Sequence, residues 1–103
     1  GQFNGRGAFR FADGSLYEGQ FVLGNILGGG VYTRPNGLRC QGEFFNNELD
    51  GRGRCTDRQG NRYQGELRGG RPHGRGTLVY RDGRRYVGLF RDGKPLLPGQ
   101  QQD

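Results

Sequence analysis

The stretch RYQGELRGGRPHGRGTLVYRDGRRY, residues 62–86, contains two tracts rich in arginine and glycine, RGGR and HGRG. In isolation, such tracts are typical of a disordered RNA-binding tail. The whole composition favours the same interpretation, because 23 of the 103 residues are glycine, only 30% are hydrophobic and the net charge is +6. A chain of this kind buries too little apolar surface to offset its ordering entropy. The aromatic content of 12% is nevertheless high for a disordered chain, so the spacing of the residues has to decide.

The spacing reveals a repeat with a step of 23 residues. Four glycine columns keep this step without an insertion or deletion, and apolar columns run in register with them. A fifth column has Asn47 in place of glycine, which fits because Asn tolerates a left-handed backbone better than most residues. The chain is therefore a folded repeat array. The glycine columns are Gly5, Gly28, Gly51 and Gly74; Gly7, Gly30, Gly53 and Gly76; Gly14, Gly37, Gly60 and Gly83; Gly19, Gly42, Gly65 and Gly88.

Each repeat has the signature of a β-hairpin. Short alternating runs flank Asp13-Gly14, Asn36-Gly37, Gln59-Gly60 and Asp82-Gly83, a pattern that favours type I′ turns with two positive φ angles. No segment has helical periodicity. We predict an all-β fold of about four 23-residue hairpins, with roughly eight short strands in one elongated, curved antiparallel sheet about 35–40 Å long. Residues 1–94 form the array, with a partial first unit, and residues 95–103 form a C-terminal cap or tail.

Three segments resemble the MORN (membrane occupation and recognition nexus) repeat, Y-x-G-x-x-x-x-G-x-x-x-G-x-G: YEGQFVLGNILGGG (17–30), CQGEFFNNELDGRG (40–53) and YQGELRGGRPHGRG (63–76). The second segment departs from the pattern at Cys40 and Asn47, and the last unit has Leu97 where glycine is expected. The resemblance covers nearly the whole chain. It implies a curved sheet that binds or scaffolds and is not an enzyme, with cytoskeletal or ciliary proteins, motor-protein tails or acidic membranes as partners.

Strand alternation places the aromatic side chains on one face of the sheet. Glycines between them leave room for the rings to lie over the backbone. Two interpretations stay open: the aromatic stripe is the closed core of a rolled sheet, or part of it lines a groove for the apolar side chains of a partner. The predicted partner-binding residues are Tyr17, Phe21, Tyr32, Phe44, Tyr63, Tyr80, Tyr86 and Phe90.

Arginine supplies all but one of the 16 basic residues. Arg39, Arg62 and Arg85 share a column, which predicts a stripe with members about 10 Å apart, two strand spacings. Arginine suits carboxylate or phosphate groups, so these residues are predicted to contact an acidic partner or anion and to set the register of a segment in the aromatic groove. In the alternative interpretation they pair with Glu43 and Glu66 and only keep the array soluble.

The last unit carries Val79, Val87 and Leu89 on the face that is polar elsewhere. We predict that Leu96 and Leu97 fold back to cap this end, as repeat arrays require; otherwise the patch is an interface. The exposed N-terminal strand leaves homodimerisation open.

Cys40 and Cys55 occupy apolar columns and are predicted to be reduced core residues. Two cysteines and the single imidazole of His73 are too few for a zinc site, and His73 and Ser15 lie in loop and turn positions. We therefore predict no catalytic residue, metal or cofactor. The reduced cysteines predict an intracellular setting. No signal peptide or membrane span is evident, so any membrane contact is expected to be peripheral. The resemblance implies a cytoplasmic protein associated with the cytoskeleton, a cilium or a membrane. The absence of methionine suggests a segment of a longer protein.

The leading hypothesis is a non-enzymatic scaffolding module that binds a segment of a cytoskeletal or motor-associated protein through its aromatic and glycine face. The alternative is peripheral binding to acidic phospholipid through the arginine stripes. Nucleic acid is the least favoured partner, because it would need bases stacked on exposed rings.

Overall fold

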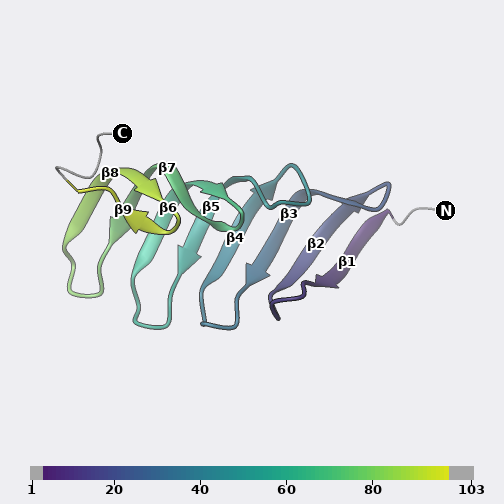
Figure 1. The fold of residues 1–103 in the computed structure, drawn as a ribbon, viewed down its shortest axis with the longest axis horizontal. Coiled ribbons are helices and arrows are strands. Elements are labelled where there is room, and N and C mark those ends of the chain that lie inside the picture. Colours follow the sequence, from purple (N-terminus) through teal and green to yellow (C-terminus); the bar gives the residue numbers. More distant parts are fainter. Residues whose placement is uncertain (1–3, 98–103) are drawn as a thin grey trace.

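The computed structural model describes residues 4–97 and arranges them as one antiparallel sheet of nine strands (Figure 1). The strands follow chain order, so each one pairs with its neighbours in sequence and the sheet stays open. This confirms the predicted fold class, with one short strand more than expected. No helix long and apolar enough to cross a bilayer occurs among residues 4–97. The strands are β1 (Gly5–Arg10), β2 (Leu16–Val22), β3 (Asn25–Thr33), β4 (Arg39–Phe44), β5 (Gly51–Thr56), β6 (Arg62–Arg68), β7 (Arg71–Val79), β8 (Arg85–Arg91) and β9 (Lys94–Pro95).

The predicted hairpin turns join β1 to β2, β3 to β4, β5 to β6 and β7 to β8. In each, only the glycine has a positive φ, between 93° and 96°, so the prediction of type I′ turns at these places is wrong. The reason is the preceding polar side chain. The Oδ1 atom of Asp13 accepts a hydrogen bond of 2.8 Å from the N–H of Ser15, and Asp82 accepts one of 3.0 Å from Arg84. Such a side-chain contact closes a wider loop without a second left-handed residue.

Paired positive φ angles occur instead at the opposite ends of the strands. Leu23 and Gly24 have φ angles of 51° and 82°, and Asp92 and Gly93 have 52° and 89°. A positive φ at both central residues is the requirement of the type I′ turn, and these pairs connect β2 to β3 and β8 to β9. Glycines at 69 and 70 do the same between β6 and β7. Three of the four connections at this end of the strands are therefore tight turns, whereas residues 45–50 form a longer loop between β4 and β5.

One glycine row crosses the first eight strands. Its members lie directly opposite one another on neighbouring strands. The aromatic residues lie next to this row, and tyrosine rings pack onto the glycine backbone. A Cβ atom placed on Gly30 would lie 2.5 Å from the ring of Tyr17, and the ring of Tyr63 covers Gly76 in the same way. The glycine row therefore makes the space that the rings fill. Its members are Gly7, Gly19, Gly30, Gly42, Gly53, Gly65, Gly76 and Gly88.

The apolar core lies on the face that carries these rings, called the covered face below. Rings meet edge to face, with centroids of Tyr63 and Phe90 4.8 Å apart and those of Tyr17 and Phe44 5.9 Å apart. Loops at one end of the strands bond to each other along the sheet: the N–H of Gly70 donates to the carbonyl of Leu49 at 3.1 Å. The buried hydrophobic residues are Tyr17, Phe21, Ile26, Tyr32, Cys40, Phe44, Leu49, Cys55, Tyr63, Leu67 and Phe90.

Cys40 and Cys55 are buried as predicted, but they form a disulfide bond, so the prediction of reduced cysteines is wrong. The register explains the bond. Cys40 of β4 lies directly opposite Cys55 of β5, with a Cα–Cα distance of 4.0 Å. Directly opposed residues on neighbouring strands point to the same face, so both sulfur atoms meet inside the core.

The C-terminal segment turns back along β8. Residues of β9 pair with Phe90 and Arg91, and the N–H of Leu96 then donates to the carbonyl of Leu89 at 2.9 Å. Leu96 thus folds back onto the last hairpin as expected, whereas Leu97 is half exposed. On the opposite face, called the open face below, Val87 stays 70% exposed, so the fold-back leaves this part of the apolar patch uncovered.

Candidate interaction surfaces

The covered face holds a groove of about 500 Å³. Cys55, Tyr63 and Leu78, from three consecutive strands, contribute to its apolar lining. Turns 34–38 and 57–61 line it from one end of the strands, and residues 71–72 and 92–94 line it from the other. Charged side chains complete the lining, namely Arg34, Asp57, Arg71, Asp92 and Lys94. The groove therefore combines an apolar interior with charges of both signs.

The predicted aromatic residues are mainly core residues. Six of the eight are at most 9% exposed, and Tyr80 and Tyr86 are half-buried. Of the eight, Tyr63 lines the groove. Closed-core packing accounts for the six buried rings, and their contact with a partner stays a prediction. The six are Tyr17, Phe21, Tyr32, Phe44, Tyr63 and Phe90.

Sequence reasoning missed the groove residues Arg34, Leu38, Arg71 and Lys94. None belongs to a column that keeps one residue type through the repeats, so periodicity gives no signal for them. They come together because loops from both ends of the strands border the same part of the covered face. Their location could be found only after the turns had been placed.

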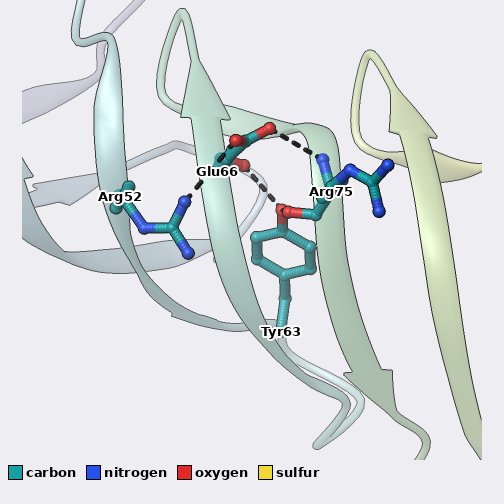
Figure 2. Close-up of polar contacts among 4 residues, drawn as sticks. All are labelled: Arg52, Tyr63, Glu66 and Arg75. Carbon is teal, nitrogen blue, oxygen red and sulfur yellow. Dashed lines mark hydrogen bonds and ion pairs between the residues drawn. The ribbon is translucent and has the colours of Figure 1, made fainter.

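A polar network surrounds the hydroxyl group of Tyr63 (Figure 2). Its hydroxyl donates to the carbonyl of Glu66 at 2.6 Å and to that of Arg75 at 3.3 Å. The Glu66 carboxylate accepts the N–H of Arg75 at 2.8 Å and lies 3.5 Å from the guanidinium of Arg52. Burial raises the pKa of Tyr63 to about 12. The network ties β5, β6 and β7 together through one phenol and one carboxylate.

The Tyr63 phenol makes stability sensitive to alkali. Its folded pKa of about 12 exceeds the ordinary value of about 10, so its contribution is complete below pH 10 and is lost as the pH rises from 10 to 12. Urea unfolding at pH 9 and pH 11 should show this loss, and Tyr63→Phe should reduce the difference between the two pH values. An equal difference in both proteins would contradict the assignment.

Arg39, Arg62 and Arg85 form a row on the open face, called the arginine row below. Each immediately precedes a residue of the cysteine and tyrosine column, so it points to the face opposite the groove. All three are exposed. The row and the groove therefore lie on opposite faces of the sheet, and contact of these arginines with a segment bound in the groove stays a prediction.

The predicted pairing of the arginine row with Glu43 and Glu66 is not found among residues 4–97, where Glu66 pairs with Arg52. The register gives the reason. Glu66 follows Arg62 by four residues on the same strand, a distance of about 13 Å along an extended chain. Glu43 stands in the same relation to Arg39. The guanidinium groups of the row consequently keep their capacity to bind carboxylate or phosphate.

Residues 4–97 hold no group of three His, Cys, Asp or Glu side chains suited to a metal ion. An open sheet of β-hairpins at a constant step, with a ring-covered glycine face and a polar face, defines a β-repeat interaction module. Within this class, the MORN repeat family model matches residues 1–16, 17–39, 40–62 and 63–84, and the chain belongs to the MORN repeat family. MORN repeats are non-catalytic modules that interact with proteins and membranes. None of the curated proteins compared with the chain matches it.

Proposed function

We propose that this chain is a scaffolding module that holds a segment of a partner protein in the covered-face groove. The observation that carries the proposal is the groove itself: about 500 Å³, lined by Tyr63 and Leu78 and bordered by charged side chains. Ligand sites commonly have volumes of about 300–1,000 Å³, an apolar lining and a few polar groups that fix orientation. A groove of this size accepts a few apolar side chains of a longer segment.

The residues of the groove indicate the chemistry of that segment. Leu38 and Leu78 are half-buried, so apolar side chains of the partner would cover their remaining exposed surface. Three cationic side chains, Arg34, Arg71 and Lys94, line the groove against two carboxylates, Asp57 and Asp92, and this positive balance favours acidic residues flanking those apolar side chains. The proposed partner segment is therefore apolar at its centre and acidic beside it.

A cytoskeletal or motor-associated partner and a cytoplasmic setting are the proposals that the family suggests. The disulfide provides a test of the setting, since stable disulfides are rare in the cytosol. Alkylation of thiols in intact cells, before lysis, would show whether Cys40 and Cys55 are bonded there. A fully oxidised pair would argue against a cytoplasmic location.

Site-specific photo-crosslinking tests the groove. Gln59 is exposed and lines the groove, whereas Gln41 is exposed on the open face. A photoreactive residue at position 59 should capture a partner that the same residue at position 41 does not. Equal capture from both positions would contradict binding in the groove.

A groove variant should weaken binding of the captured partner. Leu38→Gln places a polar amide in the groove, and we expect a loss of affinity of about tenfold, or about 1.4 kcal/mol, more than most interface residues contribute. Val87→Gln on the open face is the matched control and should bind like the unmodified chain. Circular dichroism and thermal unfolding verify that both variants are folded. Phe44 and Tyr63 are poor probes, because both side chains are almost wholly buried, at 1% and 3% exposure, and their replacement would also disturb the core.

Peripheral binding to acidic phospholipid is the second candidate function. It is supported by the exposure of Arg39, Arg62 and Arg85 on one face, since each basic residue near an anionic membrane contributes about 1 kcal/mol. Sedimentation with phosphatidylserine vesicles, at low and high salt, tests it directly. Binding should fall steeply as the ionic strength rises.

A further inference from the structure

We propose that the open face carries a second peptide site, independent of the groove. In this site, the arginine row binds an acidic segment in the polyproline II conformation, with a carboxylate at every third residue. The inference goes beyond the groove function, because its residues lie on the opposite face of the sheet and its ligand has a different chemistry.

The spacing of the row selects the conformation of the ligand. Arg39, Arg62 and Arg85 lie on β4, β6 and β8, and neighbouring members are two strand spacings apart, about 9.4–9.8 Å. A polyproline II helix repeats one face every three residues, or about 9.3 Å. An α-helix returns to one face after seven residues, about 10.5 Å, and a β-strand after two or four residues, roughly 7 or 13 Å. Polyproline II gives the best match.

The register also isolates the row from negative charge. Its members alternate with Thr56 and Val79 across the strands, so the row itself contains no acidic residue. The carboxylates of the neighbouring turns are already engaged: Asp57 accepts the N–H groups of Gln59 and Asn61, and Asp82 binds Arg84. Exposed Arg52, Arg54 and Arg75 lie beside the row on the same face. What distinguishes the row is its regular spacing, which a linear polyanion with a matching repeat can follow residue by residue.

A shallow depression of about 370 Å³ adjoins the row at Arg62. Val79 offers an apolar surface to a residue between two carboxylates of the ligand, and Arg54 adds a second cation. Thr56, Gln64 and Thr77, whose side chains carry hydroxyl and amide donors, also line it. A polyproline II chain makes no internal hydrogen bonds, so its carbonyl groups are free to accept from these donors. The depression thus offers apolar and hydrogen-bonding contacts in addition to the ion pairs of the arginine row.

The decisive probe is a fluorescent peptide of four Glu-Pro-Pro units, which is preformed in the proposed conformation. The comparison peptide has the same composition, with its four glutamates consecutive. Fluorescence anisotropy at low salt should show severalfold tighter binding of the first peptide. Replacing Arg39, Arg62 and Arg85 with Gln should weaken it by roughly three- to a hundredfold, since each exposed ion pair contributes about 1.4- to fivefold.

The matched control is Arg6→Gln combined with Arg68→Gln and Arg91→Gln, which removes the same charge at exposed positions outside the row. It should retain most of the affinity, as should Leu38→Gln in the groove. Equal binding of the two peptides, or an equal loss of affinity in the two triple variants, would overturn the proposal. Binding would then be explained by the overall positive charge of the protein. Sedimentation with phosphatidylserine vesicles that depends on the row, without peptide binding, would overturn it in favour of lipid. Either result would leave the groove function standing.

Discussion

Reduction of the Cys40–Cys55 disulfide is expected to lower the free energy of unfolding by about 3 kcal/mol. The bond joins residues with a sequence separation of 15, and closing a loop of this length restricts the unfolded chain by about that amount. For a domain of roughly 100 residues, each kcal/mol corresponds to about 4–8 °C in Tm. The reduced protein should therefore unfold some 12–24 °C below the oxidised one.

The reduced protein should still fold. Both sulfur atoms lie in the core, at 0% and 2% residue exposure, and reduced cysteine packs as a small hydrophobic residue. Thermal unfolding with and without reductant measures the effect, and mass spectrometry after alkylation verifies that the bond is broken. The double variant Cys40→Ala with Cys55→Ala is the control, because its Tm should not respond to reductant. An unchanged Tm of the verified reduced protein would contradict the prediction.

The fold was predictable because every hairpin adds the same number of residues. Equivalent positions then form columns in the sequence, and the aromatic and glycine columns directly reported the strands and their two faces. The turn type was mispredicted, because an Asp-Gly pair fits two geometries. The contact from the Asp13 carboxylate to Ser15 N–H, which selects one of them, is a local hydrogen bond that periodicity does not encode.

The disulfide and the groove were not predictable from the columns. A column consists of equivalent positions in different repeats. Neighbouring strands, however, bring non-equivalent positions into contact, and the columns do not report such contacts. Cys40 and Cys55 belong to different columns and meet only because of the turn length between β4 and β5. The groove depends on loops such as residues 92–94 bordering the face near Tyr63. The spacing of the arginine row was predictable. Its distance from Glu43 and Glu66 could be judged only once the strands and the positions of these residues along them were known.

Substitution of Gly53 by Ala is expected to be strongly destabilising, because this glycine is one of those in the glycine row whose Cβ would meet the backbone of the paired strand. A Cβ atom at this position would lie 2.9 Å from the Cα atom of Gly42 and would contact the carbonyl oxygen of Gln41 even more closely. Both are backbone atoms of the paired strand β4, so no side-chain rotation relieves the overlap. The strands would have to move apart at the centre of the glycine row. We expect a loss of stability at or above the upper end of the roughly 1–3 kcal/mol typical of overpacking.

Gly29→Ala provides the matched control for this steric argument. Its Cβ atom would meet the Glu43 carboxylate at 3.2 Å, and that flexible, exposed side chain can rotate away. Neither glycine has a left-handed φ, so alanine is not excluded by backbone conformation at either site. Alanine at position 29 should therefore change the free energy of unfolding by less than about 1 kcal/mol. Urea unfolding measures the free energy of unfolding of both variants. Similar losses of stability in the two would contradict the steric argument, because they would show that glycine content in general, and not close strand contact at the glycine row, sets the stability of the array.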